Sequence, residues 1–260
     1  MDSPVIQSLE QRLVTIASGK GGVGKTWVSV TLSQALARLN KNILLFDGDL
    51  GMANVDIQLG MMPTKDVSNV ISGDMTIAQA TTTYSEPGNK VHFDVLAGKS
   101  GSGSLGALTR EKLSKLRTGL INSAANYDNV LLDLAAGIDP SVIALSYHKG
   151  TILVVMTADP TSLTDAYAFI KVTNMRNPNA KIAIVVNNAA SKKEGERTYE
   201  AVKRACEGFL KISPPLAAII KTDNKVREAI RSQTPLFSRY PQSEAAANVM
   251  ELADFVIKNS

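Results

Sequence analysis

The chain has 260 residues, of which 44% are hydrophobic and 20% are charged, a composition that can bury one large core. A single cysteine excludes an intrachain disulfide, residues 1–13 lack the apolar core of a signal peptide, and no apolar run is long enough to span a bilayer. We therefore expect a soluble cytoplasmic protein with one domain over 1–260, of which residues 1–12 are an N-terminal extension.

Strands and helices are predicted in alternation along the chain. Short continuous apolar runs indicate strands that are buried on both faces, as in a parallel sheet. The predicted strands are Leu13–Ala17, Asn42–Asp47, Val91–Ala97, Asn129–Asp133, Thr151–Met156, Lys181–Asn187 and Pro215–Ile220. The predicted helices are Lys25–Leu39, Thr109–Ser123, Thr161–Arg176, Glu194–Leu210, Asp223–Ser232 and Gln242–Ile257. This order predicts an α/β fold, a mostly parallel twisted sheet with helices on both faces.

Two helices show which side chains should be buried. Leu163, Tyr167 and Ile170 recur at helical spacing, as in a stripe packed on a sheet. Cys206 falls in register with Val202 and Phe209, so we expect a buried packing residue and not a reactive thiol. The glycine- and serine-rich stretch Gly98–Gly106 is predicted to be a surface loop.

The formal net charge is +4. This excess of positive charge either serves only solubility or attracts DNA or acidic lipid. The excess is concentrated in the last third of the chain. The residues concerned are Lys192, Lys193, Arg197, Lys203, Arg204, Lys211, Lys221, Lys225, Arg227, Arg231 and Arg239.

The stretch SGKGGVGKT over residues 18–26 matches the phosphate-loop pattern G-x-x-x-x-G-K-[ST] between a predicted strand and a predicted helix. Backbone N–H groups of Gly21, Gly22, Val23 and Gly24 are expected to face the phosphates of ATP or ADP, aided by the helix N-terminus. Lys25 should reach the β and γ oxygens, and the Thr26 hydroxyl should bind Mg²⁺.

A magnesium site also needs a carboxylate at the end of a neighbouring strand, and Asp133 ends the strand NVLLD. An aspartate in that place can also simply start a turn. The small residues that follow end at Gly137, whose N–H can approach a γ-phosphate and sense its presence.

Hydrolysis needs a group that positions the attacking water. Many phosphate-loop NTPases have a glutamate directly after the magnesium aspartate, but here that position is Leu134. The stretch FDGDLGMANVD supplies Asp47, Asp49 and Asp56 at the rim where an open parallel sheet binds ligands, although Asp-Gly is also a common turn pair.

Taken together, SGKGGVGKT, LLFDGDLGMANVDIQLG and NVLLDLAAGI resemble the MinD/ParA family of deviant-Walker ATPases. The similarity is greatest to its MinD and FlhG/FleN branch, whose members position cell division or set flagellar number and placement. It extends from Leu13 to about Ile257.

The resemblance implies a role for several residues at matching positions. Lys20 corresponds to the signature lysine that reaches the partner subunit's phosphates in an ATP-bound homodimer. Asp49 corresponds to the aspartate that positions water, with Asp47 beside it near magnesium and Asp133 as the strand-end aspartate. Gly137 lies in the segment that reads the γ-phosphate. Asn187 corresponds to the residue that recognises adenine, although an asparagine after a strand is often a turn former.

The chain departs from the family pattern at three points. Lys221 replaces a usual proline, which puts adenine contacts from that loop in question. Trp27 replaces a small or polar residue, and we expect it to pack under the first helical turn and to report nucleotide binding by fluorescence. Relatives generally end in a basic amphipathic membrane helix, whereas this sequence ends in VIKNS, which implies membrane contact through a partner or a shortened end.

Three functions are consistent with the sequence. The first is an ATP-driven dimerisation switch that slowly hydrolyses ATP and binds a regulatory protein according to its nucleotide state. The second is a ParA-type partition ATPase that binds DNA nonspecifically through its basic late helices. The third is a nucleotide-regulated scaffold at a polar machine. An iron–sulfur carrier or reductase of the same superfamily is excluded, because Cys206 alone cannot supply its ligands.

Overall fold

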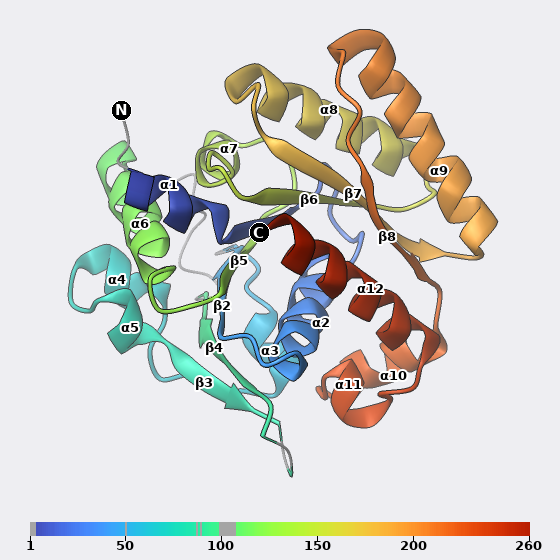
Figure 1. The fold of residues 1–260 in the computed structure, drawn as a ribbon. Helices are drawn as coiled ribbons and strands as arrows, with labels where there is room; N and C mark the ends of the chain where they lie inside the picture. The colour runs from blue at the N-terminus through green and yellow to red at the C-terminus, as the bar shows by residue number, and fades with distance from the viewer. Residues whose placement is uncertain (1–3, 50, 87, 89, 99–107) are drawn as a thin grey trace.

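A computed structural model describes residues 4–49, 51–86, 88, 90–98 and 108–260, and its centre is one eight-stranded sheet. The strands are β1 (Leu13–Ala17), β2 (Ile43–Gly48), β3 (Thr82–Ser85), β4 (His92–Leu96), β5 (Asn129–Leu134), β6 (Thr151–Met156), β7 (Lys181–Ala189) and β8 (Leu216–Lys221). Their order in the sheet is β3-β4-β2-β5-β1-β6-β7-β8 (Figure 1). Only the edge strand β3 is antiparallel to its neighbour. The predicted mostly parallel sheet is confirmed.

The seven predicted strands are all present. Every residue of β1, β2, β5 and β6 is buried, as their uninterrupted apolar runs indicate. Strand β3 is not predicted by the sequence, because its four residues TTYS are mostly polar and only Tyr84 is buried. Position 50, positions 87 and 89, and most of the predicted loop Gly98–Gly106 lie outside the described residues.

Helices cover both faces of the sheet (Figure 1). The long ones are α2 (Lys25–Arg38), α6 (Arg110–Ser123), α8 (Pro160–Arg176), α9 (Lys192–Ala205) and α12 (Glu244–Asn259). One face carries α2 and α12, which share a core cluster, and the other face carries α6, α8 and α9. The shorter helices are α1 (Pro4–Gln11), α3 (Val55–Leu59), α4 (Val67–Ser72), α5 (Ile77–Ala80), α7 (Pro140–Leu145), α10 (Asn224–Arg231) and α11 (Leu236–Arg239).

The N-terminal extension contains helix α1. It lies beside α6, where the buried Glu10 carboxylate pairs with Arg117 at 2.7 Å (Figure 1). Of the short helices only α10 was predicted, because four to eight residues carry too little apolar periodicity to be recognised.

Cys206 is buried, as predicted, but Phe209, which a regular helix would place in register with it, is exposed. Helix α9 passes into a π-helical turn over Cys206–Leu210, and Lys211 follows in the left-handed conformation. The wider turn changes the angular register after Cys206, so Phe209 points outward with 80% of its surface exposed. The predicted stripe on α8 is confirmed, since Ile170 is buried and Leu163 and Tyr167 pack against the same cluster.

Candidate nucleotide site

The phosphate loop over residues 18–26 lies between β1 and α2, at the carboxyl edge of the sheet. Gly22 and Gly24 have φ of 78° and 91°, in the left-handed region that favours glycine. A Cβ on Gly19 would lie 2.0 Å from the Asp165 carbonyl oxygen in α8. The first glycine of the motif is therefore required by close packing of the loop on α8.

Lys25 and Thr26 open α2 and are close to Asp133. The Ser29 hydroxyl, one turn further along α2, donates to Asp133 Oδ1 at 3.1 Å. Asp133 Oδ2 is buried and has no hydrogen-bond partner among the described residues. Burial raises the pKa of Asp133 to about 6, although Lys25, Thr26 and Ser29 oppose the shift. One oxygen of this carboxylate is thus unsatisfied and available to a cation.

Asp47 lies next to Asp133, because the register of β2 and β5 pairs these two residues. Asp47 Oδ1 accepts the Asp49 N–H at 3.2 Å, and Oδ2 accepts the Asn54 and Val55 N–H groups at 3.0 and 3.1 Å. Burial, followed by the charge of Asp133, raises the pKa of Asp47 to about 8. Asp47 therefore organises the loop after β2, and burial beside Asp133 favours its protonated form.

Asp49 lies in that loop, close enough to Asp133 for the two charges to interact. Its Oδ1 accepts the Met52 N–H at 3.2 Å, and its Oδ2 makes no hydrogen bond with the described residues. Asp56 lies in the first turn of α3, where its Oδ1 accepts the Ile57 N–H. Of the carboxylates in this stretch, Asp47 and Asp49 gather around Asp133.

Gly137 connects the segment after β5 to the phosphate loop. Its φ is 102°, and its N–H donates to the Ser18 carbonyl oxygen at 2.9 Å. The sequence predicts that this N–H can approach a γ-phosphate. In this structure it is already engaged with the phosphate loop.

Lys20 extends away from Lys25, toward the start of α8. Its Nζ donates to the Thr161 hydroxyl and lies 3.6 Å from Asp159 Oδ1. Its side chain is 39% exposed, whereas Lys25 is only 8% exposed. The two lysines of the motif therefore differ in environment as well as in direction.

A pocket of 250 Å³ beside the phosphate loop is lined by Trp27, Asn187 and Lys221, among others. Asn187 Nδ2 donates to the Val23 carbonyl oxygen at 2.8 Å, and Oδ1 accepts no hydrogen bond from the described residues. Trp27 is buried in the first turn of α2, and its Nε1 has no hydrogen-bond partner among the described residues. Lys221 pairs with Glu244 of α12. The pocket can therefore hold a planar base with hydrogen-bonding edges.

Two contacts of the site were not predicted. Ser29 was missed because a serine inside a helix gives no sign of which strand it faces. The sequence DPTS over residues 159–162 does indicate a helix start, with an N-cap aspartate and proline at the first helical position. Nothing in that pattern shows that Asp159 contacts Lys20.

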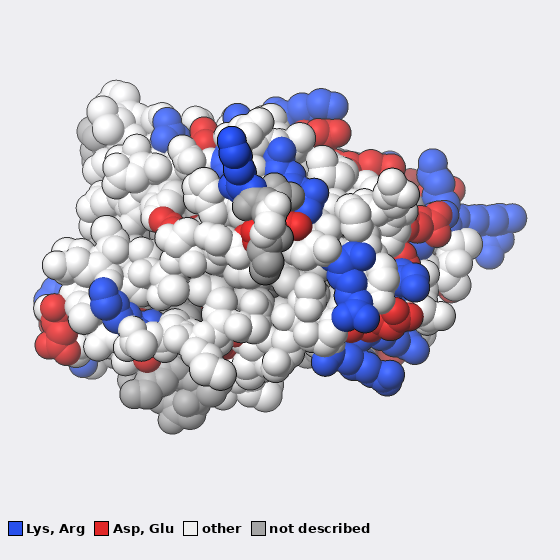
Figure 2. Space-filling view, turned by 90° about the horizontal axis from the view of Figure 1, so that it is seen from below, with Lys and Arg blue, Asp and Glu red and all other residues white. Residues whose placement is uncertain are grey.

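Lysine and arginine gather on the side of the molecule that carries α9, α10 and α11, where acidic residues are interspersed (Figure 2). Several of these cations are paired: Lys203 with Glu200 and Glu207, Lys221 with Glu244, and Lys225 with Glu228. The local surplus is thus partly neutralised. Within the described residues, no helix is both long enough and apolar enough to cross a bilayer.

The residues at the site fit a nucleotide with Mg²⁺. The unsatisfied Asp133 oxygen and the Thr26 hydroxyl are hard oxygen ligands beside a phosphate loop. The described residues contain no group of three acidic, histidine or cysteine side chains able to hold a metal alone. Mg²⁺ in nucleotide sites needs only one or two protein ligands, since phosphates and water complete its coordination.

Comparison with known proteins places this geometry in a family. Residues 14–236 match the model of the CobQ/CobB/MinD/ParA nucleotide binding domain. The chain is 32% identical over 235 residues to the antiactivator FleN of Pseudomonas aeruginosa, covering 90% of this chain and 82% of FleN. It is 27% identical to the flagellum site-determining protein YlxH of Helicobacter pylori, covering 95% and 82%.

Among solved structures, the cell division ATPase MinD of Pyrococcus furiosus aligns with a TM-score of 0.76 and 25% identity, covering 96% of this chain and 100% of MinD. The family model spans most of the chain, and the phosphate loop lies at the place that the motif requires. The chain belongs to the CobQ/CobB/MinD/ParA family of nucleotide-binding domains.

Proposed function

We propose that this protein is an ATP-driven dimerisation switch that hydrolyses ATP to ADP and phosphate in the spatial regulation of flagella or cell division. The observation that carries the proposal is the contrast between the buried Lys25 and the half-buried Lys20 on one phosphate loop. Lys25 serves the nucleotide of its own subunit. Lys20 lies at the rim of the nucleotide site, where it can contact the nucleotide of a second subunit.

Each group of residues at the site is assigned a separate role in hydrolysis. The N–H groups of Gly21, Gly22, Val23 and Gly24 bind phosphate oxygens, and Lys25 adds a positive charge beside them. Thr26 and Asp133 would hold Mg²⁺, which when bound would neutralise charge on the phosphates. Asp47 fixes the loop that carries Asp49, through three backbone hydrogen bonds. Asp49 orients the attacking water and accepts its proton at a carboxylate oxygen.

The nucleotide base is assigned to the pocket beside the loop. Asn187 already donates to Val23, so its free Oδ1 is the atom left to accept a hydrogen bond from the amino group of adenine. Trp27 lines that pocket. Lys221 is held by Glu244, so we assign it to the pocket wall and not to the phosphates.

Names of relatives support the biological setting. FleN is called an antiactivator, YlxH is called flagellum site-determining, and MinD is called a cell division ATPase. By analogy we propose a regulatory protein partner that reads the nucleotide state. We further propose that the protein acts in the cytoplasm and reaches a membrane or cell pole through that partner.

The test compares ATPase rate and oligomeric state for the wild type, Lys20→Ala, Asp49→Ala and the control Lys193→Ala, which removes an exposed lysine from α9. The wild type should dimerise with ATP and separate with ADP. Lys20→Ala should stay monomeric and lose roughly 10²- to 10³-fold in rate. Asp49→Ala should lose a similar factor in rate yet accumulate as the ATP-bound dimer. If Lys20→Ala leaves both properties intact, the proposal is wrong.

The clustering of cations over α9, α10 and α11 favours one alternative, a ParA-type ATPase that binds nonspecific DNA (Figure 2). Co-sedimentation with duplex DNA and with anionic liposomes, each with and without ATP, separates the two. DNA binding of this kind should weaken steeply as salt is raised from about 50 to 200 mM. Binding to neither surface would favour a scaffold that acts only through proteins.

A further inference from the structure

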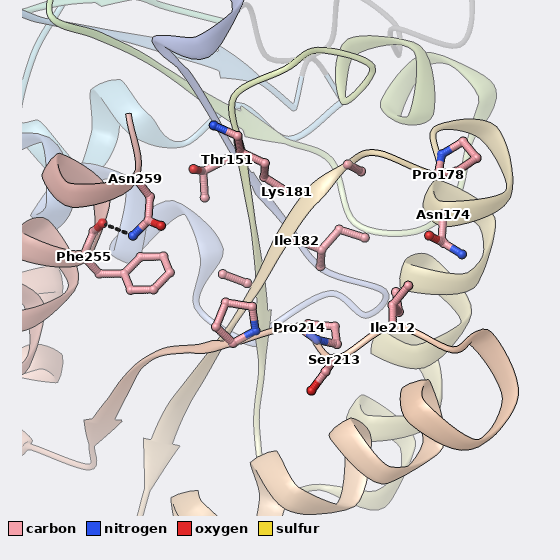
Figure 3. A pocket seen from close by; sticks show the side chains of 13 residues that line it. Thr151, Asn174, Pro178, Lys181, Ile182, Ile212, Ser213, Pro214, Phe255 and Asn259 are labelled. Carbon is pink, nitrogen blue, oxygen red and sulfur yellow. Dashed lines mark hydrogen bonds between the residues drawn. The ribbon is translucent and has the colours of Figure 1, made fainter.

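A groove of 330 Å³ lies at the amino edge of the sheet, opposite the edge that carries the phosphate loop. It runs between α12, which contributes Phe255 and Asn259, and the end of α8, which contributes Asn174 (Figure 3). Thr151 and Lys181, the first residues of β6 and β7, also line it. The nucleotide site lies past the far ends of the same strands, so the groove is a separate site.

Thr151 is the strongest sign that the groove binds a ligand. The residue is only 3% exposed, and its Oγ1 is buried without a hydrogen-bond partner among the described residues. A buried hydroxyl without a partner is unfavourable, because it has lost its bonds to water. A molecule in the groove that carries a polar atom can satisfy it.

The charge of the groove indicates which charge the polar group of the ligand should carry. Lys181 pairs directly with Thr151 in the parallel register, so both side chains lie on the same face of the sheet. Lys181 is exposed, makes no ion pair or hydrogen bond with the described residues, and is the one charged residue in the lining. A single cation without any acidic neighbour in the lining favours a monoanion over a phosphate dianion.

The rest of the lining specifies an apolar body. Ile182, Ile212, Pro214 and the Phe255 ring supply the apolar wall, and the Asn174 side chain lies at the end away from Phe255 (Figure 3). The Asn259 amide already donates to the Phe255 carbonyl oxygen at 2.7 Å, so it is held in place. A volume of 330 Å³ is near the lower limit of small-molecule pockets.

We propose that this groove binds a small carboxylate with an aromatic or short aliphatic body. The carboxylate lies between the Lys181 ammonium and the Thr151 hydroxyl, and the apolar body lies along Ile182, Pro214 and Phe255. The site is independent of the nucleotide, since its residues come from the opposite edge of the sheet.

The probe is 4-phenylbutyrate, titrated calorimetrically into protein saturated with Mg-ADP so that the phosphate loop cannot take the carboxylate. A ligand of this size should bind with a Kd of about 1 mM. The neutral analogue 4-phenylbutanol carries the same body and should bind at least about fivefold more weakly. Equal affinity of acid and alcohol, or no binding at about 10 mM acid, would overturn the proposal.

Variants locate the binding. Thr151→Val keeps the shape of the side chain and should weaken 4-phenylbutyrate about fivefold without lowering the melting temperature, because it removes an unsatisfied hydroxyl. Lys181→Ala should weaken it by a similar factor and abolish the preference for acid over alcohol. Lys193→Ala, the same change on α9, should bind like the wild type. If neither groove variant weakens binding, the carboxylate binds elsewhere and the groove is not its site.

Discussion

The Lys20 ammonium lies 3.6 Å from Asp159 Oδ1, and its Nζ also donates to the Thr161 hydroxyl at the start of α8. The same Asp159 oxygen caps α8 by accepting the Thr161 N–H at 2.8 Å. The Thr161 hydroxyl donates to the same oxygen at 2.6 Å. This bond, followed by those from the Thr161 and Ser162 N–H groups, lowers the pKa of Asp159 to about 2, so the carboxylate is charged at neutral pH. The lysine that we assign to a second subunit is thus held within its own chain.

We predict that Asp159→Asn makes ATP-dependent dimerisation easier. Asparagine can still cap α8, but it no longer attracts the Lys20 ammonium. Less interaction free energy is therefore lost when Lys20 leaves this contact to reach a partner subunit. The dimer dissociation constant with ATP should fall by up to about fivefold, the limit for an exposed ion pair. Sedimentation velocity measures it, and Asp254→Asn on the exposed face of α12 is the control. A weaker dimer would mean that Asp159 keeps Lys20 in place within the dimer.

Asp133→Asn should weaken Mg²⁺ binding without lowering the stability of the fold. Asparagine can accept the Ser29 hydrogen bond and fills the same space, but it lacks the charge that Mg²⁺ requires. We expect Mg²⁺ to bind the protein–ADP complex roughly 10- to 100-fold more weakly. The free energy of unfolding without metal should not fall, because burial of a charged carboxylate is costly and its pKa is raised. Unchanged Mg²⁺ affinity would remove Asp133 from the metal site.

Gly19→Ala should destabilise the phosphate loop, because the new Cβ would lie 2.0 Å from the Asp165 carbonyl oxygen. Overpacking against backbone should lower the free energy of unfolding by at least about 2 kcal/mol and weaken ATP binding. Gly21→Ala is a matched control, since a Cβ there meets nothing within 4 Å. Chemical denaturation measures both variants. Equal stability of the two would show that the loop and α8 can separate at little cost.

His148 should make the protein less stable in mild acid. Its Nδ1 accepts the Gly150 N–H at 3.1 Å, so Nε2 carries the proton and donates to the Thr15 hydroxyl at 2.7 Å. Burial, followed by the charge of Arg117, lowers the pKa of His148 to about 3. The unfolded chain takes up a proton below about pH 6.5, and the folded chain does not until about pH 3.

Because the folded pKa is lowered, the contribution of His148 to stability is fully present above the unfolded pKa and is lost as the pH falls. The loss is about 1.4 kcal/mol per pH unit, or roughly 2 kcal/mol between pH 7 and pH 5. His148→Gln should remove it. The comparison uses the difference between the two proteins across pH, so that carboxylates such as Asp47 contribute equally to both. Parallel stability curves would contradict the prediction.

Trp27 should report nucleotide binding, because it is the sole tryptophan and lines the pocket beside the phosphate loop. Its indole is buried before nucleotide arrives, so we expect a change in emission intensity and not a large wavelength shift. The emission intensity should change as ADP with Mg²⁺ is added and reach a plateau when the site is saturated. Trp27→Phe should abolish this change, while calorimetry still detects binding. An unresponsive signal would place the base away from Trp27.

Sequence reasoning was accurate where a single strand or helix carries the information. The apolar runs predicted every parallel strand, and the motif placed Lys25 and Thr26 at the start of α2. It was weak where packing between distant segments decides. The contact of Gly19 with α8, the pairing of Lys20 with Asp159 and the exposure of Phe209 depend on helix positions and on a π turn that no local pattern reveals.

The hydrogen bond from the Gly137 N–H to the Ser18 carbonyl oxygen occupies the group that a phosphate would need. The Ser18 carbonyl and a bound phosphate would therefore compete for the same N–H. An amide has one proton, so the N–H that serves the Ser18 carbonyl cannot serve a phosphate oxygen at the same time. Arrival of a phosphate there would exchange one hydrogen bond for another of the charge-assisted kind, and its departure would restore the first. The free-energy gap between the two positions is then the difference between two hydrogen bonds, small enough for each turnover to reverse it.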